Sequence, residues 1–413
     1  MKIKLFRSFL LLLFLSFGLV YFSGCDNEVT PSFYDADKTE GPTPIINSVQ
    51  PESRAIAAVT PITINGENFM ADSSAVKVYF GNQYGEIMSV SPTQISVMSP
   101  NVKGALGIRI STIQAVQFSN SYDYYLEPAT IDLYPLAGDE DNVPVTITLD
   151  NDENIFSSNS SLGVVKITSD SSSELYSPRA GETYFTSMRF GEDGTLYAAR
   201  NLYAVFSIPP GGGVKNSPYY LFPSRDIKIS KLEFDPMGNL WAGGANDSLY
   251  RIDSDESHSA FPFAYNVTAM RIFIDNGITY LYTAAQDENG LTTIKRSPIS
   301  ETGDLGTEET YFDFSGEYGA DYSVNDIEFA ADGEMFLATD MTDPIVYVKP
   351  DKSAGFLYPH IILKSPALSL AWGTDEYLYY VREEISDASG AVSVPQTIVK
   401  VNLMKQGAPH YGM

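Results

Sequence analysis

The chain has 413 residues, too many for one ordinary core, so its length indicates two or more domains. Asp and Glu number 52 against 26 Lys and Arg, for a formal net charge of −26. A field of that sign repels phosphate backbones, and we therefore expect no nucleic-acid partner. The single Cys excludes an intrachain disulfide and any Cys-based zinc site.

The first 24 residues have the pattern of a signal peptide. Lys2, Lys4 and Arg7 precede an apolar run over 9–22, which is shorter than the roughly 20 residues that a membrane-spanning helix needs. The run ends in small residues before Cys25, and this segment resembles the lipobox of bacterial lipoproteins. The resemblance predicts a signal peptide over 1–24 and lipidation of Cys25, with an ordinary secretory signal as the alternative.

Residues 25–42 would then form the lipidated Cys and a flexible tether. Acids, Pro, Thr and Ser are mixed there with no helical or strand periodicity. The predicted location is the cell envelope, at the outer membrane or cell surface of a Gram-negative bacterium. The membrane itself is the expected partner of the lipid anchor. The sequence leaves the membrane and its leaflet open.

Residues 43–126 predict short strands at the spacing of a β-sandwich. Ile62-Thr63-Ile64 precedes an Asn-Gly turn signal, and apolar and polar residues alternate over 76–80. Segments 62–69 and 78–81 resemble the diagnostic segments of the IPT/TIG family. That resemblance implies an immunoglobulin-like domain that acts as a spacer or interaction module and carries no catalytic residues.

One pattern recurs six times between 127 and 413. Two apolar residues, separated by one residue of any type, are followed by a short turn, a Gly position, one further residue and two more apolar residues. The Gly positions are 39 to 56 residues apart, at 153, 194, 238, 277, 333 and 376, with Glu at the first and last. Each copy predicts a β-hairpin, and repeats of about 40–50 residues are typical of propeller blades.

We therefore predict an all-β chain in which a small immunoglobulin-like β-sandwich is followed by a six-bladed β-propeller over 127–413. A strand between Thr130 and Leu136 is expected to help close the ring against the last blade. A seven-bladed ring or a large β-sandwich is the alternative architecture.

The repeats resemble NHL-type and gluconolactonase-like propellers, and the second resemblance implies a metal held by Asn, Asp and Glu at one channel mouth. Asn325-Asp326 fits one such position, but the equivalent pairs in the other copies, such as Ser230-Lys231, carry no second carboxylate or Asn. We therefore expect no metal, no cofactor and no catalytic residue, with a divalent cation such as Ca²⁺ left open. The three His residues are expected at the surface.

The long spacing before the fifth copy predicts an inserted loop that carries Tyr318 and Tyr322. Aromatic residues on loops of a rigid scaffold suit stacking on sugars or peptides. The candidate ligand-binding residues are thus Asn325, Asp326, Tyr318 and Tyr322.

The favoured function is non-catalytic binding of an envelope glycan or protein by a membrane-anchored lipoprotein. Two alternatives remain. One is a metal-dependent, lactonase-like hydrolase that uses Asn325 at the propeller channel, and the other is a structural protein that helps assemble the envelope.

Overall fold

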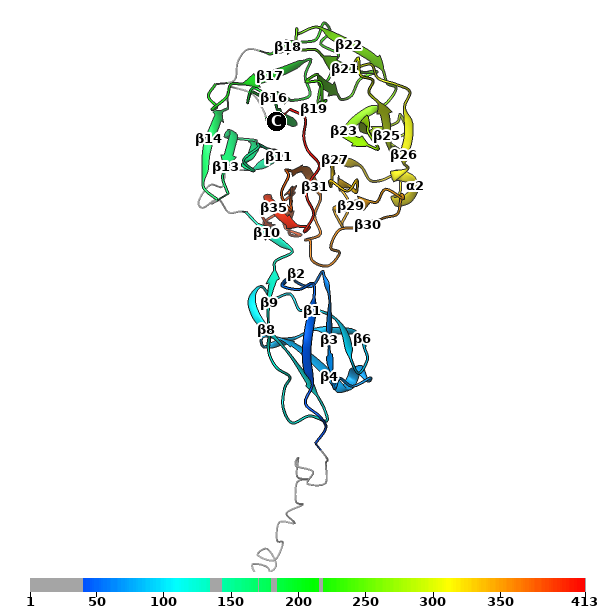
Figure 1. Cartoon of the computed structure of the whole chain (residues 1–413). Helices are drawn as coiled ribbons and strands as arrows, with labels where there is room; N and C mark the ends of the chain where they lie inside the picture. The colour runs from blue at the N-terminus through cyan, green and yellow to red at the C-terminus, as the bar shows by residue number, and fades with distance from the viewer. Residues whose placement is uncertain (1–39, 134–142, 170, 180–183, 215–217, 413) are drawn as a thin grey trace, which may run out of the picture.

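The structure is a computed structural model that describes residues 40–133, 143–169, 171–179, 184–214 and 218–412. It confirms the predicted all-β class: a small β-domain carries a ring of β-sheets (Figure 1). The expected signal peptide, Cys25 and nearly all of the tether lie outside the described residues. Among the residues described, no helix is long and apolar enough to cross a membrane.

The small domain is a sandwich of two sheets, with strand orders β1-β3-β7-β6 and β2-β9-β8-β4-β5. Alternate side chains of the two sheets face each other, and Ile62, Val78 and Ile108 are fully buried between them. The elements are β1 (Ile45–Gln50), β2 (Arg54–Ile56), β3 (Pro61–Glu67), the 3-10 helix η1 (Ser73–Ala75), β4 (Val76–Phe80), β5 (Gln83–Tyr84), β6 (Glu86–Val90), β7 (Gln94–Met98), β8 (Gly104–Thr112) and β9 (Tyr122–Glu127).

The glycine of the diagnostic segment has a packing reason. A Cβ at Gly66 would lie 1.9 Å from the carbonyl oxygen of Ile45 and 2.5 Å from the ring of Phe69. Only glycine lets β1 and β3 approach each other under that ring. Asn68 follows at φ +62° and donates its side-chain amide to the carbonyl of Thr43 at 2.9 Å, which ties the start of the domain to the motif.

The described residues of the ring form six four-stranded antiparallel sheets, as predicted (Figure 1). The first strands of neighbouring blades lie side by side around the axis. Blades 1 to 3 contain β11 (Pro144–Leu149), β12 (Ile155–Asn159), β13 (Gly163–Ile167), β14 (Ser173–Pro178); β15 (Ser187–Phe190), β16 (Leu196–Ala199), β17 (Ala204–Ile208), β18 (Tyr220–Leu221); and β19 (Lys231–Phe234), β20 (Leu240–Gly243), β21 (Ser248–Ile252), β22 (His258–Pro262).

Blades 4 and 5 contain β23 (Asn266–Asp275), β24 (Ile278–Gln286), β25 (Thr292–Pro298), β26 (Glu309–Phe312); and β27 (Val324–Phe329), β28 (Met335–Thr339), β29 (Ile345–Val348), β30 (Ala354–Phe356). Blade 6 contains β31 (Ala367–Trp372), β32 (Tyr377–Arg382), β35 (Thr397–Asn402) and β10 (Thr130–Asp132), and the two-stranded β33 (Ile385–Ser386) and β34 (Val392–Val394) lie between β32 and β35.

The recurring Gly position is the turn between the first and second strands of a blade. Gly194, Gly238, Gly277 and Gly333 have φ between +79° and +87°, and Glu153 takes φ +60° at the same place in blade 1. An L side chain is strained in this left-handed region, which is why the pattern favours Gly. The repeat in the sequence is therefore a repeat of backbone geometry.

The ring is closed by a strand from the start of the propeller, as predicted. β10 pairs antiparallel with β35, which places Asp132 beside Arg382 of β32. The Arg382 guanidinium is 2 % exposed and donates to both carboxylate oxygens of Asp132, at 3.1 and 3.0 Å. A bidentate ion pair thus fastens β10 across β35.

The closing strand follows the small domain after only two residues, and polar contacts fix this junction. The carboxylate of Glu127, at the end of β9, accepts hydrogen bonds from Arg54 at 2.8 Å and from the side chain of Asn402. Arg54 also reaches Glu376 in blade 6 at 3.0 Å. The small domain is therefore held against blade 6 by polar contacts to β35 and to the turn between β31 and β32.

The structure differs from the predicted inserted loop before the fifth copy. The additional residues lengthen β24 and β25, which have nine and seven residues, and form the one-turn helix α2 (Phe314–Tyr318). Asp313 caps this helix by accepting a hydrogen bond from the backbone of Gly316 at 3.0 Å.

Replacing Asp132 with Ala should lower the free energy of unfolding of the propeller by about 2 kcal/mol, because Arg382 stays buried without its counter-charge. Arg382→Met should cost less, since the Asp132 that remains is 45 % exposed and stays hydrated. Denaturant titration followed by tryptophan fluorescence measures this, because both Trp residues lie in the propeller core. A larger loss in Arg382→Met than in Asp132→Ala would contradict this account.

Candidate functional site

The centre of the ring holds buried ion pairs. The Nε of Arg189 on β15 donates to Glu233 on β19 at 3.0 Å, and the Nε of Arg271 on β23 donates to Glu328 on β27 at 2.9 Å. All four side chains are buried. Opposite charges compensate each other here, so the carboxylates of the channel are already used within the fold.

The predicted ligand residues Asn325 and Asp326 lie at one mouth of this channel and connect blades. The Nζ of Lys231 donates to the carbonyl of Asn325 at 2.7 Å, and the Asn325 amide donates to the carbonyl of Ala367 at 2.9 Å. Asp326 accepts the hydroxyl of Ser369 at 3.0 Å. The Lys231 amine, whose pKa is lowered mainly by burial, occupies the place where the gluconolactonase-like pattern needs oxygen ligands. The described residues contain no group of three or more His, Cys, Asp or Glu that could hold a metal ion.

The opposite mouth is covered by the C-terminal segment, residues 403–412, which we call the tail. Its Ala408 donates to the carbonyl of Phe329 at 2.8 Å, and Arg271 donates to the carbonyls of Ala408 and Pro409 at 3.1 and 3.2 Å. A Cβ on Gly407 would lie 2.0 Å from the carbonyl oxygen of Gly373. Figure 1 shows the C-terminus beside the ring axis. The tail therefore closes this mouth.

His410 of the tail lies in the channel between two carboxylates, contrary to the predicted surface position. Its Nε2 is 3.3 Å from Glu328 and its Nδ1 is 3.7 Å from Glu233, and the side chain is 9 % exposed. Burial and the charge of Arg271 favour the neutral ring, but Glu328 and Glu233 outweigh them and raise the pKa of His410. A protonated His410 would therefore hold the tail in place.

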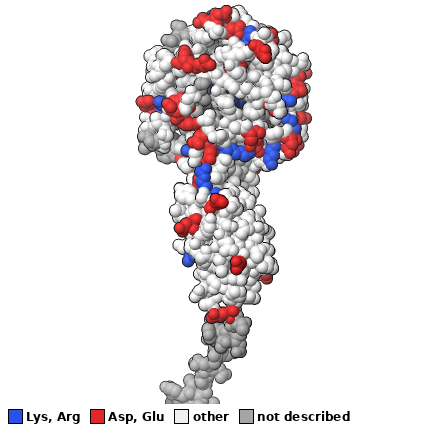
Figure 2. All heavy atoms as spheres, viewed as in Figure 1, with Lys and Arg blue, Asp and Glu red and all other residues white. Residues whose placement is uncertain are grey.

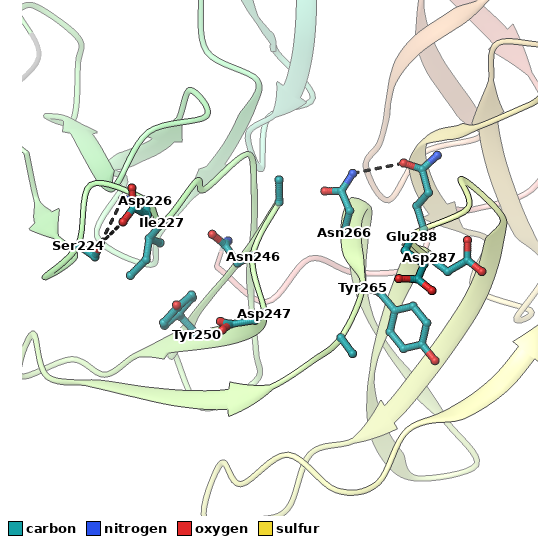
Figure 3. A pocket seen from close by; sticks show the side chains of 13 residues that line it. Ser224, Asp226, Ile227, Asn246, Asp247, Tyr250, Tyr265, Asn266, Asp287 and Glu288 are labelled. Atoms are coloured by element: carbon teal, nitrogen blue, oxygen red, sulfur yellow. Dashed lines mark hydrogen bonds between the residues drawn. The ribbon is translucent and has the colours of Figure 1, made fainter.

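The other face of the ring carries a cleft of about 700 Å³ between blades 3 and 4. Four loops form its walls: those before β19, between β20 and β21, before β23, and between β24 and β25. Figure 3 shows two groups of side chains that lie on either side of an open space. The volume lies within the usual range for ligand pockets.

Hydrogen bonds fix several polar side chains of the cleft. The side chain of Asn246 accepts the backbone N–H of Lys228 at 2.7 Å and donates to its carbonyl at 2.9 Å, which joins two of the loops. Asn266 and Gln286 meet at 3.4 Å on the opposite wall (Figure 3). The walls therefore need little rearrangement when a ligand enters.

The cleft is acidic. Asp226, Asp247, Asp287 and Glu288 line it, and none of its lining residues is Lys or Arg. A backbone hydrogen bond from Leu291 contributes most to lowering the pKa of Asp287, so this carboxylate is ionised at neutral pH. Carboxylates accept hydrogen bonds from hydroxyl and ammonium groups and repel anions.

Two tyrosines complete the cleft. Tyr265 is half-buried, with the Nζ of Lys295 lying 4.5 Å from the ring centroid on one side. Tyr250 packs edge to face on Phe222 with ring centroids 4.8 Å apart. Each tyrosine offers an apolar body and a polar hydroxyl, a combination that suits sugar rings.

Tyr318 and Tyr322 lie elsewhere, near blade 5. Tyr318 packs among Phe314 and Phe356, with ring centroids 5.3 and 5.5 Å away, and burial raises its pKa. Tyr322 is 37 % exposed. Neither ring lines the cleft between blades 3 and 4, and a ligand contact by either stays a prediction.

Sequence reasoning missed the cleft because its residues come from four loops of unrelated sequence. Ser224 and Glu288 lie on facing walls although 63 residues separate them in the chain (Figure 3). The available signal was weaker: Asn, Asp and Tyr gather just before β19 and β23 and just after β20 and β24. Only the blade order brings these four positions together.

Comparison with known families identifies the small domain. The IPT/TIG domain model matches residues 44–127, so this part of the chain is an IPT/TIG domain, as the motif predicted. No curated protein sequence matches the chain.

Solved structures share the architecture of the chain. A Bacteroides thetaiotaomicron protein described as a candidate phosphatase has a TM-score of 0.58 at 12 % identity, and covers 87 % of this chain and 97 % of its own. An auxiliary nutrient binding protein of the same bacterium has a TM-score of 0.50 at 12 % identity, with coverages of 89 % and 99 %. A gluconolactonase from Xanthomonas campestris has a TM-score of 0.50 at 11 % identity, with coverages of 66 % and 89 %. At these identities the likeness shows the fold alone.

The tail should loosen as His410 loses its proton. Its pKa is raised above 6.5 in the folded chain, so the stabilisation is complete below about pH 6.5 and is lost as pH rises through the raised pKa. Burial lowers the pKa of Lys352 to about 8. This group makes the free energy of unfolding rise with pH in an overlapping pH range, opposite to the effect of His410. The readout is therefore the difference in denaturation midpoint between the native chain and His410→Gln, measured from pH 6 to pH 9. It should shrink with rising pH, and a constant difference would argue against the ion pairs.

Proposed function

We propose that the protein is a lipid-anchored, non-catalytic binding protein of the cell envelope, and that the cleft between blades 3 and 4 binds an uncharged oligosaccharide. The observation that carries the proposal is the chemistry of this cleft. It combines four carboxylates, three side-chain amides and two tyrosines in about 700 Å³. Paired acceptors and donors beside aromatic rings match the hydroxyl-rich edges and apolar faces of sugars.

Charge limits the class of glycan. The lining carboxylates, including Asp226 and Asp247, have no Lys or Arg beside them in the cleft wall. A uronic acid or a sulfated sugar would bring its own negative charge against them. The net charge of −26 adds a long-range repulsion of the same sign. Neutral sugars avoid both costs.

The position of the cleft suits capture from outside the cell. In a ring of six blades, blade 3 lies opposite blade 6, which is the blade that carries the IPT/TIG domain (Figure 1). Figure 2 shows acidic side chains on the part of the ring far from that domain. A chain anchored at Cys25 would therefore hold the cleft at its distal end.

The channel, more than the comparisons, supports a binding role over a hydrolytic one. The structural match to the auxiliary nutrient binding protein covers 89 % of this chain and therefore extends over both of its domains. The gluconolactonase shares the propeller fold, but here Lys231 and the Arg–Glu pairs fill the channel where a metal-dependent hydrolase would work. The hydrolase alternative therefore has the fold in its favour but not the channel.

Calorimetric titration of neutral and uronic-acid oligosaccharides of equal length tests the proposal. We expect binding of at least one neutral series and none of the acidic series. Tyr265→Ala should weaken the affinity roughly tenfold by removing a stacking surface. Tyr84→Ala, which removes a 64 % exposed ring on the IPT/TIG domain, is the matched control and should leave the affinity unchanged. Lack of binding to every neutral series would refute a glycan role.

The anchor has a separate test. Cys25→Ser should move the full chain from the membrane fraction to the soluble fraction, because the lipidated thiol is lost. Metabolic labelling with a radioactive fatty acid should mark the native chain and not the variant. Equal labelling of both chains would exclude Cys25 as the lipidation site.

A further inference from the structure

The tail face of the ring carries a second cavity, of about 310 Å³, between blades 2 and 3. Its walls include Tyr197 on β16, Tyr219 before β18, Phe234 at the end of β19, and Tyr411 in the tail. The cleft proposed for glycans lies on the opposite face, so this cavity is independent of that function.

The rings of the cavity meet at steep angles. Tyr197 and Tyr219 have ring centroids 4.8 Å apart with planes at 79°, and Tyr197 and Phe234 have centroids 5.4 Å apart with planes at 73°. In each pair the edge of one ring lies against the face of the other, so the three rings, which we call the aromatic box, line the cavity in different orientations. Tyr411 packs onto the same cluster from the tail. The result is a space bounded by aromatic rings on several sides.

Carboxylates surround the aromatic box. Glu192 and Asp193 line the cavity, and among the described residues no Lys or Arg does. Asp253 also lines it, but Arg251 neutralises this carboxylate at 2.6 Å. Burial, together with the neighbouring Tyr219 and the charges of Asp193 and Glu256, raises the pKa of Tyr197 to about 12. The cavity therefore lies in a negative field and its phenol groups stay neutral.

We propose that this cavity is a binding site for an organic cation of the alkylammonium class, held among the lining rings of Tyr197, Tyr219 and Tyr411. Aromatic faces carry a negative quadrupole that attracts cations, and a quaternary ammonium group loses little hydration when it enters such a box. Glu192 and Asp193 supply the compensating charge at the rim. A neutral ligand of the same shape would gain the apolar contact but not the electrostatic attraction.

The tail builds part of this site. Tyr411 follows His410, whose position between Glu233 and Glu328 fixes the end of the chain. A Cβ on Gly412 would lie 2.0 Å from the carbonyl of Phe190, so the backbone at the end of the tail is packed tightly against blade 2. The fourth wall of the box thus depends on the seated tail.

The test compares choline with 3,3-dimethylbutan-1-ol, its uncharged carbon analogue, by titration calorimetry on the chain without residues 1–25. Choline should bind with an affinity about tenfold or more above that of the alcohol. A peptide with one trimethyllysine and the same peptide with unmodified lysine form a second pair of probes. Stronger binding of choline indicates a free small cation, and stronger binding of the trimethyllysine peptide indicates a cationic side chain of a protein, and either supports the site.

Two variants distinguish a loss of cation binding by the aromatic box from a general loss of folding. Tyr219→Leu keeps apolar volume but removes a ring, and should reduce choline affinity about tenfold. Asp193→Asn changes only an exposed carboxylate whose main hydrogen bonds an amide can keep, and should weaken choline without affecting the alcohol. Tyr84→Leu on the IPT/TIG domain is the control and should bind choline as the native chain does. Equal affinity for choline and the alcohol, or no binding of any cationic probe, would overturn the proposal.

Discussion

The ring can exist only if its first strand reaches its last blade. β10 precedes blade 1 in the chain but completes blade 6 beside β35, so the propeller closes only when both ends of its sequence are in place. Without it, the edge of β35 would expose unpaired backbone groups. Because only two residues separate the IPT/TIG domain from β10, the same closure fixes the IPT/TIG domain to the propeller. The contacts that Arg54 makes with Glu127 and Glu376 reinforce this junction.

Inside the ring, ion pairs across the channel also hold neighbouring blades together. Four neighbouring inner strands, β15, β19, β23 and β27, bring Arg189, Glu233, Arg271 and Glu328 together. Each charge is tolerated in the interior because a partner compensates it. The tail then adds His410 to the same network. An axis filled in this way has little room for a ligand, and the two cavities proposed as binding sites lie between blades instead.

The features that the sequence predicted are those set by local backbone geometry. The left-handed turns at Gly194 and Gly333 identified the blades, and the close approach at Gly66 identified the IPT/TIG domain. The site residues could not be predicted in this way. His410 has its partners in strands far away in the chain, and Tyr318 is covered by the outer strand of the next blade, so neither a surface position nor a loop could be excluded from spacing alone.

The small number of Lys and Arg residues leaves the cavities on both faces of the ring with an excess of carboxylates. Arg189 and Arg271 at the centre neutralise channel carboxylates, and no Lys or Arg in the described part of the chain lines either cavity. The acidic excess therefore remains at the surface and at the cavities. On one face this charge would repel anionic sugars, and on the other it would favour the proposed organic cation. Under the two proposals, the same acidic excess would serve different ligands because the cavity walls differ. Amide and hydroxyl groups suit sugar edges, whereas a lining of several aromatic rings suits an organic cation.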